Sequence, residues 1–275
     1  MMRLISFTFF LLIAANFVRA EEEKDPQLTG PGLEIELISE SNGITPGKPL
    51  TLGLHIHHLP GFHTYWKSPG IVGMATSIEW TLPEGFSASE IRWPYPENTF
   101  MAEYPCHGYE RDVTLVVTIT PPAQIQNKEV TFRAKSAWMC CAKGCFPGFE
   151  TFELTLPVTA EPRPVPSAKA HLAKALQEFP SKNHEIKATL HSKTDAEIIT
   201  IAFQGPLKSL LDKLYFFSND GQISSDRKQS FIKEKNGTFT LKIARSEFSP
   251  KGKLTVPGIL KVGDHYFEIE AKPAL

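Results

Sequence analysis

Beyond its first twenty residues, this sequence of 275 residues has no hydrophobic run long enough to cross a membrane. Its net charge is only −1, which argues against nucleic acid or an anionic membrane surface as a partner. Catalytic-triad order, paired-carboxylate motifs and glycine-rich phosphate loops are also missing, so a hydrolase or a kinase has no support. Cysteine is scarce, yet three of the four cysteines fall within six residues. This cluster is the most informative feature of the chain.

The first twenty residues are typical of a secretion signal. Arg3 supplies a positive charge, Leu4 to Phe17 is almost unbroken apolar sequence, and Val18-Arg19-Ala20 offers a small-residue cleavage site. We therefore predict a signal peptide over residues 1–20 and a soluble, exported mature protein that begins near Glu21. Export also permits disulfide bonds.

The mature sequence has the pattern of a β-protein. Short runs alternate apolar and polar residues, most clearly from Leu50 to Ile56. Turn-forming pairs such as Pro60-Gly61 and Pro147-Gly148 separate these runs. Regularly spaced short strands with such turns predict an all-β chain of the sandwich type.

A proline-rich segment, Glu161 to Pro166, interrupts this pattern. We predict a single helix after it, from Ser167 as N-cap to Phe179, ended by Pro180. Strand-like runs resume at Ile186. The chain is therefore divided into a first β-domain over residues 31–160, a linker and helix over 161–181, and a second β-domain over 182–275.

The spacing of the cysteines limits how they can pair. A disulfide requires Cα atoms about 4.4–6.8 Å apart, whereas residues four apart on an extended strand are about 13 Å apart. Cys141 and Cys145 can therefore bond only if the intervening Ala142-Lys143-Gly144 turns back sharply. Adjacent cysteines on a strand point to opposite faces, so Cys140 needs another partner. The most economical pairing is Cys141–Cys145 with a second disulfide, Cys106–Cys140.

Three interpretations of the cluster remain open. Both disulfides could be structural. A loop this short gives little stabilisation, about 2 kcal/mol or less, and Lys143 inside it favours a thiolate, which points instead to a redox-active pair. The third interpretation is a Cu(I) site, because the cluster is rich in soft ligands. Its candidate ligands are Met139, Cys140, Cys141, Cys145 and His107.

Five motifs occur in order along residues 33 to 160. They are GFHTYWKSPG from Gly61, IEWTLPEGF from Ile78, WPYP from Trp93, GYE from Gly108 and WMCCAKGCFPG from Trp138. Together they resemble the N-terminal periplasmic domain of the thiol:disulfide interchange protein DsbD, especially the branch seen in the copper-tolerance protein ScsB. Leu214 to Phe217 and the residues after them resemble the second β-domain of the ScsB-type region.

The resemblance implies an immunoglobulin-like sandwich, a periplasmic location and a redox-active pair formed by Cys141 and Cys145. It also implies that the aromatic loop from Phe100 to Tyr109, with Phe100 and Tyr104, shields this pair. Family members accept electrons from a membrane domain and pass them to periplasmic thioredoxin-fold proteins, without a cofactor. Since this chain has neither a membrane domain nor a thioredoxin domain, we expect a membrane electron donor in trans.

Cys106 and Cys140 match no pair of the family.

From the resemblance we predict a periplasmic thiol:disulfide interchange module, an oxidoreductase that relays electrons through Cys141 and Cys145 to disulfide or copper-stress proteins. The alternative is a Cu(I)-binding or protein-binding β-sandwich module in which both disulfides are structural.

Overall fold

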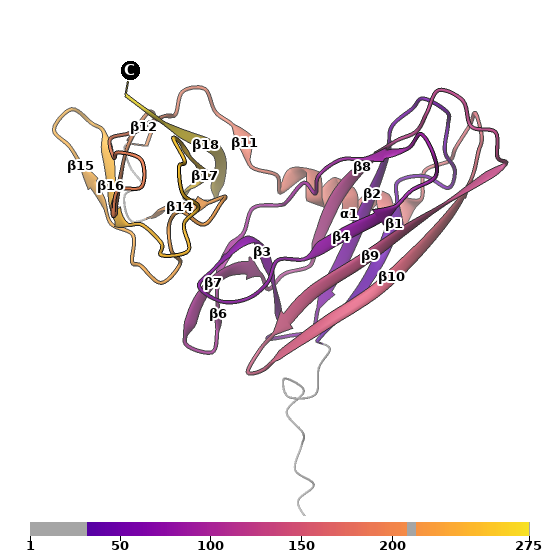
Figure 1. Cartoon of the computed structure of the whole chain (residues 1–275), viewed down its shortest axis with the longest axis horizontal. Coiled ribbons are helices and arrows are strands. Elements are labelled where there is room, and N and C mark those ends of the chain that lie inside the picture. The colour runs from indigo at the N-terminus through magenta and orange to yellow at the C-terminus, as the bar shows by residue number, and fades with distance from the viewer. Residues whose placement is uncertain (1–31, 208–212, 275) are drawn as a thin grey trace, which may run out of the picture.

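The computed structural model describes residues 32–207 and 213–274 (Figure 1). The predicted signal peptide, residues 1–20, lies outside these ranges. Strands dominate the described residues, and one helix, α1 (Pro166–Gln177), interrupts them between β10 (Cys145–Pro157) and β11 (Ser181–Lys182). The predicted all-β class is confirmed.

The strands between Leu33 and Pro157 form two antiparallel sheets. The four-stranded sheet has the order β1-β2-β8-β5. Its strands are β1 (Leu33–Ser39), β2 (Leu50–His58), β8 (Val113–Thr120) and β5 (Ser87–Ala88). The six-stranded sheet has the order β10-β9-β3-β7-β6, with β4 paired to β9. Its strands are β3 (His63–Gly70), β4 (Ser77–Thr81), β6 (Glu97–Met101), β7 (Tyr104–Tyr109), β9 (Glu129–Cys141) and β10 (Cys145–Pro157).

The two sheets share a core built from the alternating apolar positions of their strands. Leu52 and Val117 from the first sheet meet Phe132 and Leu156 from the second in one buried cluster. Burial of side chains of this size stabilises the fold by about 1.5–3 kcal/mol each. The alternation read from the sequence thus gives each sheet one inward face.

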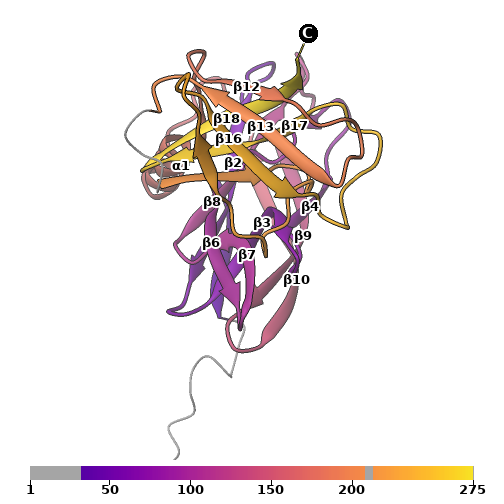
Figure 2. The ribbon, with the colours of Figure 1, turned by 90° about the vertical axis from the view of Figure 1, so that its left-hand side faces the viewer.

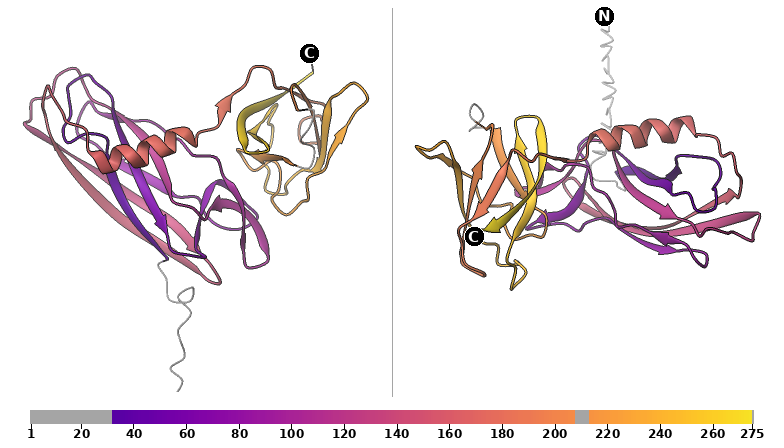
Figure 3. Two further views of the ribbon diagram at one scale, coloured as in Figure 1. Left: turned by 180° about the vertical axis from the view of Figure 1, so that it is seen from behind. Right: turned by 90° about the horizontal axis from the view of Figure 1, so that it is seen from above.

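The single helix of the described residues, α1 (Pro166–Gln177), begins one residue before the predicted N-cap. Val165 is the N-cap, and Pro166 takes the first turn, where its missing N–H leaves no hydrogen bond unmade. The helix buries Ala168 and Leu172 against Ile38 of β1, so it covers the four-stranded sheet instead of standing free (Figure 3). Among the described residues, no helix has the length and apolar character needed to cross a bilayer.

Beyond the helix, one eight-stranded sheet surrounds a separate apolar core. Its order is β14-β17-β18-β12-β13-β16-β15, with β11 paired to β18. The strands are β11 (Ser181–Lys182), β12 (Lys187–Leu190), β13 (Ile198–Gln204), β14 (Leu214–Ser218), β15 (Phe231–Lys233), β16 (Phe239–Ala244), β17 (Val256–Val262) and β18 (His265–Pro273).

This sheet contacts the end of the sandwich that carries β3 and β7, and it lies in front of the sandwich in Figure 2. Trp66 of β3 and Phe217 of β14 belong to one buried cluster, with ring centroids 6.1 Å apart. Tyr95 stacks on Tyr266 of β18 at 3.8 Å. The eight-stranded sheet is therefore joined to the sandwich through aromatic contacts as well as through the continuous chain after α1.

Two local predictions were wrong. The segment predicted as an aromatic loop, Phe100 to Tyr109, lies mostly in the β6–β7 hairpin. Pro147-Gly148, predicted as a turn, lies inside β10. Gly148 is opposite Trp138 on β9, and a Cβ on it would lie only 2.2 Å from the indole ring. The glycine at this position therefore makes room for a cross-strand aromatic side chain.

Candidate redox site

The disulfide closes the turn of the β9–β10 hairpin. Cys141 is the last residue of β9 and Cys145 the first of β10, and the two are opposite each other in the strand register. Ala142 donates a backbone hydrogen bond to the carbonyl of Gly144 at 2.8 Å, which tightens the connecting loop. The sulfurs are bonded and the Cα atoms are 4.1 Å apart. The predicted Cys141–Cys145 pairing is present in the structure.

The two cysteines differ in their access to solvent. Cys141 is fully buried, whereas Cys145 is exposed. The cause is the position of each strand: β9 lies between β10 and β3, while β10 is the outermost strand of its sheet. Of the two residues, only Cys145 lies where a second molecule can reach it.

The predicted Cys106–Cys140 disulfide is wrong, because both residues carry free thiols. Cys140 points into the sandwich core with Trp66. Cys106, on β7, instead belongs with Cys141 and Tyr65 to a small cluster on the outer side of the sheet. The sheet therefore separates the two thiols. Burial raises the pKa of each thiol to about 12, so both stay protonated at neutral pH.

His63, from the GFHTYWKSPG motif, is a neighbour of the disulfide that was not among the predicted site residues. It is opposite Cys141 in the β3–β9 register, and its Nε2 lies 4.0 Å from the sulfur of Cys106. Burial lowers the pKa of His63, which keeps the imidazole neutral. The sequence signal was alternation along the His63-Thr64-Tyr65-Trp66 motif, which puts His63 and Tyr65 on one face.

The outer cluster around Cys141 is covered by apolar side chains. Met101 from the β6–β7 hairpin and Met139 from β9 pack against it. The predicted shielding residues Phe100 and Tyr104 lie on the same hairpin, with 59% and 45% of their surface exposed. Lys143 is exposed in the loop between the paired cysteines.

The residues predicted as Cu(I) ligands are not all brought together: Met139, Cys141 and Cys145 lie on one face of the hairpin, but Cys140 and His107 lie elsewhere. Cys140 and Cys141 face opposite sides of β9. His107 is buried where the two β-regions meet, with its Nε2 2.9 Å from the hydroxyl of Tyr215. Within residues 32–207 and 213–274, no three histidine, cysteine or acidic side chains are grouped closely enough to hold a metal ion.

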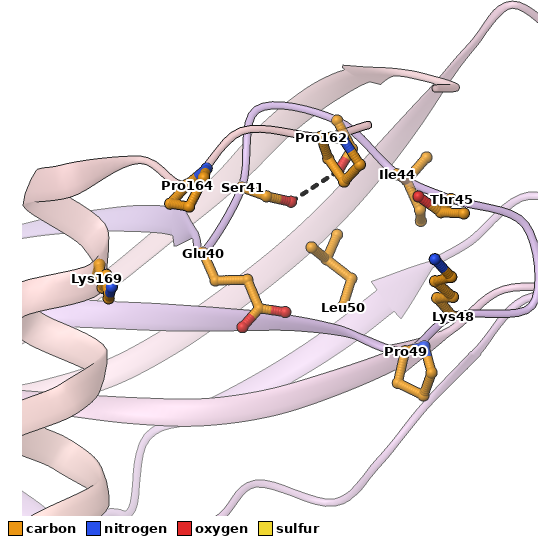
Figure 4. Close-up of a pocket in the computed structure, with 11 residues that line it drawn as sticks. Glu40, Ser41, Ile44, Thr45, Lys48, Pro49, Leu50, Pro162, Pro164 and Lys169 are labelled. Atoms are coloured by element: carbon orange, nitrogen blue, oxygen red, sulfur yellow. Dashed lines mark hydrogen bonds between the residues drawn. The ribbon is translucent and has the colours of Figure 1, made fainter. Parts of the chain in front are cut away.

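A pocket of about 310 Å³ lies at the other end of the sandwich from the disulfide (Figure 4). It lies beside the loop between β1 and β2, where Ile44 bridges to Val158, just beyond the far end of β10. Glu40, Lys48 and Lys169 surround it together with prolines. None of the side chains that line this pocket carries a thiol.

Comparison with known proteins identifies the family of the sandwich region. Residues 37–157 match the family model described as Thiol:disulfide interchange protein DsbD, N-terminal. A comparison with curated protein sequences gives no match. Among solved structures, the chain is similar to the crystal structure of the N-terminal periplasmic domain of ScsB from Proteus mirabilis.

That structural match has a TM-score of 0.64 at 14% sequence identity, and it covers 90% of this chain and 96% of the other. The identity is low, so the match shows a shared fold, and its coverage extends the likeness beyond the sandwich. The family match and the hairpin disulfide lie in the same region. Residues 37–157 of this chain form a DsbD N-terminal-like domain.

Proposed function

We propose that the protein is a periplasmic thiol:disulfide interchange module that relays electrons through the Cys141–Cys145 pair. The observation that carries the proposal is the unequal exposure of the two cysteines in a DsbD N-terminal-like domain. Exchange requires one sulfur that a partner can reach and a second that completes the reaction within the molecule. A disulfide on a short hairpin loop also adds little to stability.

In the reducing step, a thiolate of the electron donor attacks the sulfur of Cys145. The Cys141–Cys145 bond breaks, a mixed disulfide forms between Cys145 and the donor, and Cys141 leaves as a thiolate that takes up a proton. The donor's second thiolate then attacks the sulfur of the donor's first cysteine in the mixed disulfide and releases Cys145. The donor dithiol is oxidised to a disulfide, and the pair gains two electrons and two protons.

In the oxidising step, the reduced pair acts on a partner disulfide. The Cys145 thiolate attacks one partner sulfur, the partner disulfide breaks, and Cys141 then attacks Cys145 to re-form the pair. The partner leaves as a dithiol. The proposed donor is a membrane protein of the DsbD type acting in trans, and the proposed acceptors are periplasmic thioredoxin-fold proteins, including those of copper stress.

The remaining cysteines have a passive role in this scheme. Cys106 and Cys140 are protonated, and thiols react far more slowly than thiolates. They therefore do not compete with Cys145 for a partner. Lys143 favours the thiolate of the pair through its charge, and the β6–β7 hairpin, which carries Phe100 and Tyr104, shields the Cys141 side of the disulfide and leaves Cys145 open.

The second β-region is proposed to be a separate immunoglobulin-like domain that supports the redox domain. Its aromatic contacts reach Trp66 of β3, the strand next to β9. By contacting β3, it holds in place the strand with which β9 of the disulfide-bearing hairpin pairs.

Equilibration with thioredoxin tests the proposed activity. Structural disulfides have potentials below roughly −300 mV, whereas thioredoxin lies near −270 mV. Excess reduced thioredoxin is therefore expected to convert Cys141–Cys145 to a dithiol, detected by alkylation and mass spectrometry. A pair that stays oxidised would contradict the proposal and favour a structural disulfide in a protein-binding module.

A further inference from the structure

The outer face of the β9–β10 ribbon changes character along its length. Far from the disulfide, this face is charged. Arg133 on β9 pairs with Glu153 on β10 at 2.6 Å. Two residues nearer to the disulfide, Lys135 pairs with Glu79 of β4 at 3.6 Å. Such exposed ion pairs keep a β-surface in water and discourage association.

Nearer the disulfide, the same face becomes apolar. The register places Ala137 opposite Phe149, Met139 opposite Pro147, and then Cys141 opposite Cys145. Directly opposed residues of antiparallel strands share a face, and every second residue returns to it. These three pairs therefore form one continuous strip, named here the disulfide strip, that ends at the reactive bond.

Phe149 is the exposed part of this strip. Its side chain is 71% exposed, whereas Phe152, Leu154 and Leu156, on the opposite face of the same strand, pack against the core. The fold gains little from a phenyl ring in water, and exposed aromatic side chains next to polar surroundings are typical of protein–protein contacts. Cys145, Pro147 and Phe149 alternate along β10, so the ring and the exposed sulfur face the same direction.

The strip lies at the border of the molecule, because β10 is the outermost strand of its sheet (Figure 1). Pro147 has no N–H to donate, so β10 cannot offer an unbroken row of donors to an added strand. Recognition on this edge must therefore use the side chains of the outer face instead of strand addition.

We propose that the disulfide strip is the docking surface for a thioredoxin-fold partner, with Phe149 as its main contact. The proposal rests on the proposed exchange function. A protein whose cysteine reaches Cys145 has to cover the residues beside it, and the strip is the apolar surface continuous with that sulfur. A small thiol reacts with the sulfur of Cys145 alone. It does not extend to Phe149, which is two pairs further along the disulfide strip.

Two reductants distinguish docking from chemistry. The rate of reduction of Cys141–Cys145 is measured with reduced thioredoxin and, separately, with reduced glutathione, in wild type, Phe149→Ser, Phe149→Leu and Phe248→Ser. Phe248 is the matched control, because it is 73% exposed and lies outside the sandwich. Circular dichroism checks that each variant is folded.

We expect Phe149→Ser to slow reduction by thioredoxin roughly tenfold, equivalent to about 1.4 kcal/mol, without changing the rate with glutathione. Phe149→Leu should keep most of the thioredoxin rate, and Phe248→Ser should keep all of it. An unchanged thioredoxin rate in Phe149→Ser, or equal losses with both reductants, would overturn the docking proposal while leaving exchange intact. Failure of the wild type with both reductants would instead overturn the proposed function, and the docking surface with it.

Discussion

Cys141 and Cys145 face each other across the turn of the β9–β10 hairpin, with Cα atoms 4.1 Å apart, yet only Cys145 is exposed. The two sulfurs of one bond therefore have different environments. Cys141 is enclosed by Tyr65, Met101 and Met139 on the outer side of the sheet. This asymmetry assigns Cys145 to the encounter with a partner and Cys141 to the internal step.

Replacing one cysteine at a time should separate these two roles. In Cys141→Ser, the exposed Cys145 has no internal thiol to release a bound partner, so its thiolate should attack oxidised glutathione, release one reduced glutathione and accumulate as a mixed disulfide. In Cys145→Ser, the remaining thiol is buried and little adduct should form. Intact mass spectrometry measures both. Similar adduct yields from the two variants would contradict the assignment.

Cys106 and Cys140 should be unreactive in the folded protein. Burial raises the pKa of each thiol to about 12, so the thiolate is scarce at neutral pH. Native oxidised protein treated with a maleimide at pH 7 is expected to remain unmodified, and two thiols should become available after unfolding. Finding no thiol after unfolding would show that these residues are bonded to each other.

Gly148 should tolerate no side chain. A Cβ there would lie 2.2 Å from the ring of Trp138, so Gly148→Ala must displace the indole. Overpacking of this kind costs about 1–3 kcal/mol. Gly144→Ala is the control, because its Cβ would meet only Phe146, at 3.8 Å. Urea unfolding of the oxidised proteins compares the two, and equal stabilities would refute the packing argument.

Stability should fall in mild acid. Burial lowers the pKa of His58 and of His107 to about 4. The unfolded chain, with a histidine pKa near 6.5, therefore binds protons before the folded protein does. The free energy of unfolding should be greatest above about pH 6.5 and decrease between pH 6.5 and 4, by up to about 3 kcal/mol for each histidine. Urea unfolding across this range measures it.

His107→Gln is the informative variant for this pH effect. It removes one of the two histidines whose pKa is lowered to about 4, and it keeps a polar side chain beside Tyr215. The decrease in stability toward pH 4 should become shallower than in wild type. An identical pH dependence in the two proteins would show that His107 is not a source of the effect.

Much of the fold could be predicted from local sequence. Alternation along Leu50 to Ile56 gave β2, and the alanine- and leucine-rich segment before Pro180 gave α1. The β6–β7 hairpin could not be predicted, because Pro105 and Gly108 interrupt any apolar alternation there. β7 forms because it pairs with β3, and β6 in turn pairs with β7; the contact with β3 is not encoded in local patterns.

The site was predictable only where it is local. The pairing of Cys141 with Cys145 follows from the length of the loop between them. The partner of Cys140 was mispredicted because the face that Cys106 occupies is set by the position of β7 in the sheet, which depends on distant residues. Pro147-Gly148 resembled a turn, since sequence does not reveal that β10 is an edge strand that accepts proline.

In the proposed function, Cys141 and Cys145 exchange electrons, whereas Cys106 and Cys140 do not. A redox titration of the mature protein against glutathione, with the state of each cysteine determined by alkylation and mass spectrometry, tests it most directly. The account predicts that Cys141 and Cys145 titrate together as a two-electron couple above roughly −300 mV, with Cys106 and Cys140 remaining thiols throughout. A Cys141–Cys145 bond that resists reduction until the protein unfolds would contradict it.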